Sequence, residues 1–458
     1  MKSTRQTYLL LLGGMLGMSS CSQVDSPDYP DSEQGRRIIF HSSIPGITTR
    51  ASEIAETLGY FHVTAFDQSD TSLINGGIMG EYIDRLRIEK EESGDSYKSD
   101  FCNWPLPGHE SDLLHFFAFY PQIPASSSIS NGTVPSGSGI AIDYKINKYK
   151  VASEIADQVD FVAAYASGSM EKNLFSGIKL DFHHMLSRIE IKAWGANKSC
   201  DIEIAGVRIG ATGVEDTFSF VPSEDAGAWT GKPTTGNVEY IYRNGDNILT
   251  LDKKAGSPLT EAAAQSIMGS RIGEYDNCAM LIPASYAGWK YSEDSHNNQG
   301  GMYLSVLLRV TDATSTGEGA QVYPYADTAQ GANSSAISTV WLTVDKATGK
   351  KAGTRVYMKD GAYFTDSACT LPYSLADNEE VKAFGWASLP ISGDWEAGCI
   401  YTYTLDYSYG IGLHGPDTPD EGNKKAGDPI ISDNVGVSVS VKDWKSGGEA
   451  SGVEVPGS

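Results

Sequence analysis

The sequence predicts an all-β protein made of two β-sandwich domains in tandem. Past residue 35, apolar and polar side chains alternate with a period of two in most segments, which places one face of a strand on a core and the other in water. The 49 glycines and 19 prolines modestly exceed their usual combined share of about 12% and favour short strands and turns. Helical patterns are few and short, at residues 52–58 and 261–268.

Six segments show the alternation most clearly, and we expect each to form a strand: residues 178–182, 189–193, 202–204, 303–310, 401–405 and 435–441. Two stretches rich in Ser, Gly, Asn and Asp, at 126–139 and 288–301, are expected to be long surface loops. We place the domain boundary near residue 200. Residues 51–200 then form the N-terminal sandwich, and residues 201–458 form the C-terminal one, with a last strand and a polar tail.

The charge balance excludes one class of partner. The chain has 35 basic and 58 acidic side chains and a net charge of −23, which repels phosphate backbones. We therefore expect no nucleic-acid binding.

No pattern in the sequence points to catalysis, a metal ion or a cofactor. There is no Gly-x-Ser-x-Gly elbow, no Walker loop and no His-Glu-x-x-His helix. His183 and His184 are adjacent, but neighbours on a strand point to opposite faces, which favours a structural role over a shared metal. Five cysteines follow Cys21 at wide spacing, and their odd number argues against a complete disulfide framework. We predict that the protein is not an enzyme, and a secreted hydrolase is a minor alternative.

The first 20 residues have the layout of a secretory signal peptide. Lys2 and Arg5 precede an apolar run over 8–18 that is too short to span a membrane. Cys21 follows two small residues, and the sequence around it resembles a bacterial lipobox, in which the cysteine is lipidated after the signal is cut. The alternative is an ordinary signal peptide followed by an unrelated cysteine. Residues 22–35 are polar and acidic and are expected to form a solvated tether.

Several segments together resemble the fimbrillin family of Bacteroidetes, the major or tip subunits of type V pili. They occur in order along the chain at residues 38–40, 48–51, 103–105, 115–121, 160–164, 180–189, 280–283, 395–403 and 439–444. The resemblance implies two transthyretin-like Greek-key β-sandwich domains and a structural role in adhesion. It also implies export to the outer membrane as a lipoprotein anchored through Cys21, followed by incorporation into an extracellular fimbrium.

The same resemblance implies maturation by an Arg-specific protease and assembly with other pilus subunits by strand exchange. Arg50 and Ala51 match the cut site, in a polar segment of the kind that forms an exposed loop. The removable first strand would contain Ile38, Ile39 and Phe40, so that residues 21–50 act as a lipidated tether and propeptide. Cutting at Arg36 or Arg37 is the alternative, and Arg50 could also be an ordinary loop residue.

A donor strand must present alternate apolar side chains to a row of pockets while its backbone completes a sheet. The C-terminal segment has this pattern in Val435, Val437, Val439 and Val441. It could equally be the last strand of its own domain, in which case the subunit would only accept a strand and would suit a tip position. The sequence leaves both positions open.

The alternative function is a surface lipoprotein that binds glycans or host ligands without polymerising. Exposed aromatic side chains clustered on one sandwich face would support it. Trp289, Tyr291, Trp395 and Tyr401 are weak candidates for such a cluster, because aromatic residues at strand spacing more often lie in a core.

Overall fold

A computed structural model of the chain describes residues 36–44, 58–68, 80–92, 94–106, 108–123, 127–130, 133–136, 139–142, 144–197, 199–222, 226–241, 248–252, 257–268, 278–290, 300–313, 321–324, 338–343, 354–359, 362–374, 382–416, 425–431 and 435–443. The expected signal peptide, Cys21, Arg50 and Ala51 lie outside these ranges, so lipidation and processing stay predictions. The expected helix at 52–58 also falls almost entirely outside them.

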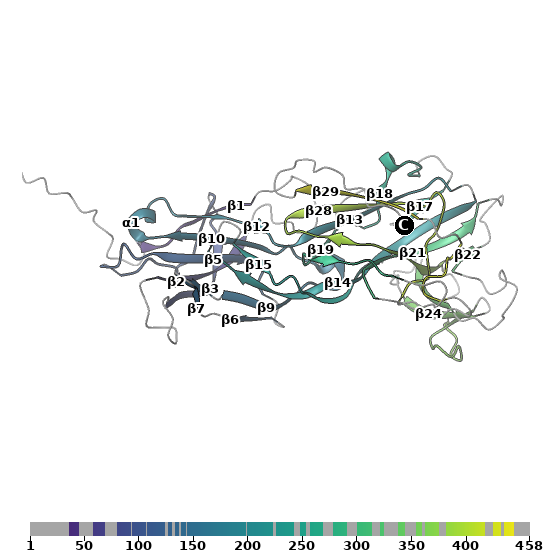
Figure 1. Cartoon of the computed structure of the whole chain (residues 1–458), viewed down its shortest axis with the longest axis horizontal. Helices are drawn as coiled ribbons and strands as arrows, with labels where there is room; N and C mark the ends of the chain where they lie inside the picture. Colours follow the sequence, from purple (N-terminus) through teal and green to yellow (C-terminus); the bar gives the residue numbers. More distant parts are fainter. Residues whose placement is uncertain are drawn as a thin grey trace, which may run out of the picture.

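The first sheet gathers the N-terminal half of the molecule at one end of an elongated body (Figure 1). Within the described ranges its strands run in the order β11 (Ile178–Asp181), β1 (Phe40–Ser43), β4 (Ser96–Lys98), β3 (Gly80–Lys90), β2 (Tyr60–Asp67), β5 (Leu114–Tyr120), β10 (Val162–Gly168) and β12 (His183–His184). Helix α1 (Met170–Asn173) connects β10 to β11. Strand β11 therefore lies beside β1, although many strands of the sheet separate the two in sequence.

The second and third sheets form the rest of the body. The second runs β18 (Gln265–Ser266), β13 (Ser187–Trp194), β28 (Cys399–Asp406) and β29 (Gly436–Asp443), with β19 (Ala279–Leu281) also beside β13. The third runs β25 (Ala362–Phe364), β24 (Thr354–Lys359), β23 (Ser338–Thr343), β26 (Lys382–Pro390), β21 (Tyr303–Asp312), β14 (Cys200–Phe220), β9 (Tyr144–Lys150) and β6 (Ser128–Ser130). Four shorter strands pair with its long members: β15 (Gly227–Trp229), β16 (Thr234–Ile241) and β17 (Leu249–Leu251) with β14, and β22 (Gln321–Tyr323) with β21.

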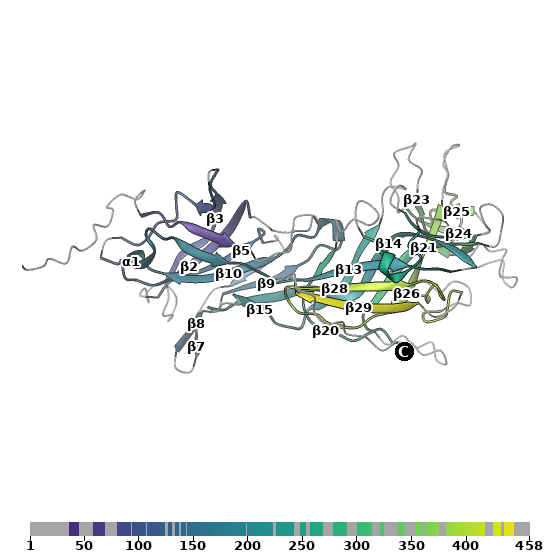
Figure 2. The same cartoon turned by 90° about the horizontal axis from the view of Figure 1, so that it is seen from above.

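Two small ribbons and two helical turns complete the described elements. The ribbons are β20 (Ser285–Tyr286) with β27 (Gly393–Asp394), and β7 (Thr133–Ser136) with β8 (Gly139–Ile142), which stands away from the body in Figure 2. The turns are the 3-10 segments η2 (Ile155–Asp157) and η4 (Glu261–Ala263). In this part of the chain no helix is long and apolar enough to cross a membrane.

The predicted all-β class is confirmed, and strands form at all six segments with the clearest alternation. Two local expectations are wrong. The helix expected over 261–268 stops after one turn, because β18 pairs with β13 and the Ile267 amide donates to the Ile191 carbonyl. The stretch expected to be a loop at 126–139 carries strands β6 and β7, which pair with β9 and β8.

Strand β14 links the two ends of the body. Its N-terminal part pairs with β21, and its C-terminal part pairs with β9, which belongs to the N-terminal half of the sequence. Figure 2 shows β14 and β9 running through the middle of the molecule. Strand pairing therefore joins residues before position 200 to residues after it.

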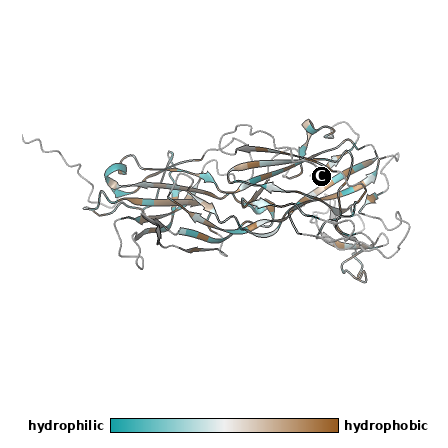
Figure 3. Ribbon diagram, viewed as in Figure 1, coloured by the Kyte–Doolittle hydropathy of each residue, from teal (hydrophilic) through white to brown (hydrophobic). Residues whose placement is uncertain are grey.

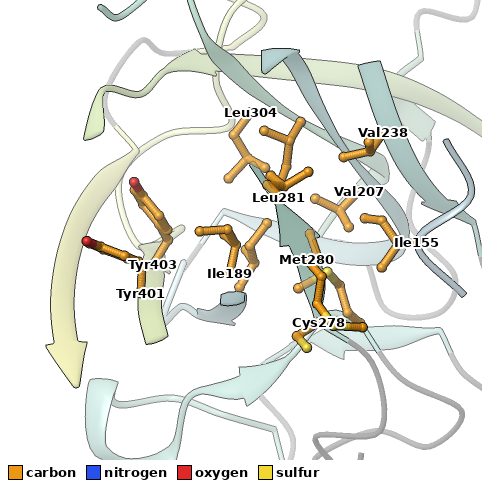
Figure 4. Close-up of a cluster of buried hydrophobic side chains, with 14 of the residues drawn as sticks. Ile155, Ile189, Val207, Val238, Cys278, Met280, Leu281, Leu304, Tyr401 and Tyr403 are labelled. Atoms are coloured by element: carbon orange, nitrogen blue, oxygen red, sulfur yellow. The ribbon is translucent and has the colours of Figure 1, made fainter. Parts of the chain in front are cut away.

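The strands carry both apolar and polar residues (Figure 3). The buried apolar residues form two main cores. One lies on one face of the first sheet, and the larger one lies between the second and third sheets and extends to the other face of the first sheet at Phe66, Phe117 and Phe119. Figure 4 shows part of the larger core, where Ile189 of β13, Val207 of β14 and Leu304 of β21 meet, each with no exposed surface. Burial on this scale is the main stabilising term of the fold.

A buried, hydrogen-bonded histidine–aspartate pair lies where the first sheet adjoins β13. Nδ1 of His184 is 2.6 Å from Oδ2 of Asp160, and neither side chain has exposed surface. His183, on the opposite face of the strand, is partly exposed, as expected for strand neighbours. No group of residues in the described ranges could hold a metal ion.

We expect His184→Ala to lower the free energy of unfolding by about 3–5 kcal/mol, because it leaves the Asp160 carboxylate buried without this partner. Urea unfolding measures the loss. The matched control is His109→Ala, whose Nδ1 lies 2.7 Å from Oδ2 of Asp112 at an exposed position. The control should cost less than about 1 kcal/mol, and equal losses for both variants would contradict the prediction.

Candidate functional site

The N-terminal strand β1 lies in a groove between two segments that are distant in sequence. On one side it runs parallel to β11, with Phe40 opposite Ile178 and Ser43 opposite Asp181. On the other side it runs antiparallel to β4, with Phe40 opposite Tyr97. Figure 1 shows β1 within the half of the body that holds the first sheet. Strand β1 thus occupies an interior position of the first sheet, between β11 and β4, and we call the space that it occupies the groove.

The residues before β1 continue this pairing along residues 102–104. The Ile38 amide donates to the Cys102 carbonyl at 2.9 Å, and the Trp104 amide donates to the Arg36 carbonyl at 2.7 Å. Arg37 forms an isolated antiparallel bridge with Asn103. On the other side the Ile178 amide donates to the Ile39 carbonyl at 2.8 Å. Segment 36–44 therefore bonds through its backbone on both edges.

Side chains of segment 36–44 alternate between the core and the surface. Ile38 and Phe40 have no exposed surface, Ile39 is half-buried on the outer face, and His41 is exposed. The predicted strand of Ile38, Ile39 and Phe40 thus sends two of its three side chains into the core. Moving two apolar side chains of this size from water into a core stabilises the seated strand by about 1.5–3 kcal/mol each.

Phe40 anchors the segment. Its ring meets Phe61 at a centroid distance of 5.8 Å and Phe116 at 5.5 Å, both edge-on. Edge-to-face pairs of this kind add about 0.5–1.5 kcal/mol each beyond area burial. Trp104 lies beneath the same cluster, with its ring 6.1 Å from that of Phe116.

Arg36 is buried at the start of the segment, with 5% exposed surface. Its Nη1 donates to the carbonyl oxygens of Trp104 at 3.4 Å and Pro105 at 3.1 Å. Arg37 instead points outward and pairs with Asp100 at 2.5 Å. Of the two alternative cut sites, Arg36 is therefore enclosed by the fold.

The far end of the groove makes polar and close backbone contacts. The Ser43 hydroxyl donates to the Asp181 carboxylate and, together with Lys179, lowers the pKa of that carboxyl. This contact is present at neutral pH and is lost in acid as the carboxylate becomes protonated. Gly177 has φ +71°, and a Cβ there would lie 2.8 Å from the Ile39 carbonyl oxygen, so only glycine lets β11 approach this closely.

Strand β29 covers most of the predicted donor segment, residues 435–441, and lies at the edge of the second sheet. It pairs with β28 over its whole length, with Tyr401 opposite Val441 and Leu405 opposite Val437. The four alternating valines are partly buried and pack against the larger core: Val435, Val437, Val439 and Val441. In this structure the predicted donor strand is thus seated in its own domain, and its donation stays a prediction.

The aromatic residues considered for a ligand-binding face are mostly core. Trp289, Trp395 and Tyr401 are 2%, 3% and 6% exposed, and the Trp395 indole donates to the Tyr403 hydroxyl at 3.0 Å. Tyr291 lies outside the described ranges. These side chains therefore form no exposed binding surface.

Sequence reasoning missed the groove itself. It identified segment 38–40 and the separate motifs at 103–105 and 180–189, but not that they are neighbours in one sheet. Cys102 gave no signal as an isolated cysteine, although it is fully buried against the Ile38 backbone. Burial raises the pKa of its thiol to about 12.

Comparison with known proteins gives distant structural likenesses. No family model and no curated protein matches the sequence. The chain is similar to a proposed cell adhesion protein from Bacteroides uniformis, with 13% identity and a TM-score of 0.34 over 89% of this chain and 98% of that one. A proposed cell adhesion protein from Bacteroides ovatus gives 14% identity and a TM-score of 0.34 over 87% and 99%. A proposed adhesin from Bacteroides thetaiotaomicron gives 10% identity and a TM-score of 0.24 over 63% and 79%. With TM-scores this low, the likenesses carry no argument about function.

We expect Phe40→Ala to destabilise the N-terminal sheet by about 3–5 kcal/mol, because it removes two ring contacts and leaves a cavity. His41→Ala, at the exposed neighbouring position, should change stability by less than about 0.5 kcal/mol. Urea unfolding of both variants checks the prediction. A Phe40→Ala protein as stable as His41→Ala would mean that β1 does not hold this core together.

Proposed function

We propose that this chain is a fimbrillin-type adhesion subunit whose N-terminal strand is a removable occupant of a strand-accepting groove. The proposal rests on one observation, the position of segment 36–44 in the first sheet. The segment completes the first sheet on both edges and contributes Ile38 and Phe40 to its core. It is joined to the rest of the domain only through residues 45–57, so one cut there would turn an internal strand into a bound peptide.

The sequence supplies one point for such a cut. Residues 45–57 contain a single basic side chain, Arg50. Cleavage between Arg50 and Ala51 by an Arg-specific protease would separate the lipidated tether, beginning at Cys21, from the body. This part of the proposal rests on the sequence alone.

Departure of the strand would leave a surface that another strand can satisfy. The freed edges of β11 and of residues 102–104 would lose backbone hydrogen bonds, and the rings of Phe61 and Phe116 would lose contact with Phe40. Buried polar groups without partners and newly exposed apolar surface are both costly. A strand from a neighbouring subunit with apolar side chains at alternate positions would restore both terms.

The source of that strand is the second part of the proposal. Strand β29 carries the required alternation, but its valines are used in its own core. The geometry therefore supports an accepting role for this subunit more directly than a donating one. An accepting subunit of this kind would serve adhesion at the outer membrane or within an extracellular fimbrium.

We expect cleavage at Arg50 to make Cys102 reactive once the strand leaves. In the intact chain Cys102 and Cys278 are both buried thiols, and burial raises their pKa values to about 12 and about 11, so little reactive thiolate forms at neutral pH. Cut protein in mild urea should label at Cys102 at least tenfold faster than at Cys278, as measured by mass spectrometry of the peptides. The Arg50→Gln chain, treated identically, is the control. Equal labelling of the two thiols after cutting would contradict the proposal.

We also expect the emptied groove to bind strands from solution. A fluorescent peptide of residues 36–44 should bind the cut protein, and fluorescence anisotropy should detect no binding to the Arg50→Gln chain. A peptide with Asp in place of Phe40 is the matched control, because it keeps the backbone and loses the anchor. A peptide of residues 435–443 tests the donor: competition with 36–44 would support donation by β29, and failure to compete would support a subunit that only accepts. If the native peptide does not bind, the groove is not an acceptor.

A further inference from the structure

A second concave site lies on the N-terminal half of the molecule, away from the β1 groove. It is a pocket of about 670 Å³ between the first sheet and strand β6. Its lining combines charged, polar and apolar side chains, among them Asp84, Arg85, Phe119, Gln122, Ser127 and Ile129. Pockets with a few convergent polar groups on an apolar lining are the usual form of small-molecule sites.

One wall of the pocket is a strained bulge in β3. Two residues, Asp84 and Arg85, stand opposite the single residue Thr64 of β2. Arg85 has φ +45°, in the left-handed region that non-glycine residues rarely adopt. Bulges of this type turn side chains out of the strand's regular alternation, and strained residues persist only where their surroundings hold them.

The surroundings of the bulge do hold it. The Arg85 amide donates to the Thr64 hydroxyl at 3.0 Å, and that hydroxyl lies 2.7 Å from the buried Tyr144 hydroxyl. Nδ1 of His62 lies 3.3 Å from the Arg85 carbonyl oxygen, and the His62 ring stacks on Phe119 at 5.6 Å. Hydrogen bonds from neighbouring residues therefore hold the bulge in place.

The bulge presents a fixed pair of hydrogen-bonding groups to the pocket. Nε and Nη2 of Arg85 each lie 2.6 Å from an oxygen of Asp84, and both side chains remain about half exposed, at 52% and 42%. The guanidinium has further N–H donors, and the carboxylate has further lone pairs. The pair offers donors and acceptors side by side with no net charge.

The opposite wall rests on a second bulge. Lys148 of β9 has φ +54°, and Asn147 and Lys148 together stand opposite Thr217 of β14. The Ser127 hydroxyl donates to the Lys148 carbonyl at 2.8 Å, which ties the start of β6 to this bulge. Ile129 on β6 is partly buried and gives this wall an apolar patch.

We propose that this pocket binds a neutral saccharide. A sugar ring has apolar C–H faces and a rim of hydroxyls that donate and accept at once, which matches Ile129 and the partly exposed His62 ring beside the Asp84–Arg85 pair and the Gln122 amide. The Asp84 carboxylate disfavours an anionic ligand, and Arg85 disfavours a cationic one. The volume suits one or two sugar rings. The inference does not depend on strand exchange, because the intact chain carries the pocket.

The test uses the full chain on a printed array of neutral, N-acetylated and sialylated oligosaccharides and of peptides, followed by titration calorimetry with the strongest neutral sugar. Asp84→Asn and Arg85→Gly should each weaken binding at least tenfold. Glycine accepts the left-handed backbone, so the melting temperature of Arg85→Gly should equal or exceed that of the unmodified chain. Arg87→Gln, on the same strand but outside the pocket lining, is the control and should leave affinity unchanged within about twofold.

Neutral-sugar binding that both pocket variants weaken, with retained melting temperature, would establish the site. No binding to any neutral sugar would overturn the proposal. Preferential binding of peptides or sialylated glycans, or sugar binding that Asp84→Asn and Arg85→Gly leave intact, would overturn it as well.

Discussion

The N-terminal half of this protein depends on the rule that backbone groups in a sheet must find partners. Segments 102–104 and 178–182 come from distant parts of the chain and do not pair with each other; segment 36–44 lies between them and bonds to both. The same segment brings Phe40 into a cluster of aromatic rings. Hydrogen bonding and packing therefore converge on one short stretch, and the domain is complete only while that stretch, or one like it, is present.

The two strands that drew attention in the sequence have different positions in the fold. Segment 36–44, which contains β1, is held on both edges and reaches the core through the fully buried side chains of Ile38 and Phe40. Strand β29 lies at the edge of a sheet, pairs with β28, and contributes three partly buried valines, with Val435 just before it. Strand β1 is an interior strand of its sheet, whereas β29 is an edge strand. Alternation alone predicts both as strands and cannot distinguish these positions.

Period-two patterning was enough to predict the all-β class and the strands at 178–182 and 189–193, because those segments each bury one face. The helical pattern failed at 261–268, where a single helical turn gives way to pairing with β13, a long-range contact that local pattern does not encode. The family resemblance predicted a first strand at Ile38, Ile39 and Phe40 but not which segments flank it, and the observed strand β1 begins at Phe40. The bulge at Arg85 could not be predicted for a similar reason, since its left-handed backbone depends on Thr64 and Tyr144 in other strands.

The mixed pairing of β1 gives the groove a sense of direction. One wall accepts a strand that runs alongside it in the same sense, and the other accepts one that runs in the opposite sense. A segment entering backwards would meet both walls with the wrong hydrogen-bond pattern, because parallel and antiparallel ladders space their donors and acceptors differently. Any filament built through this groove would consequently have a head and a tail, with every member facing the same way.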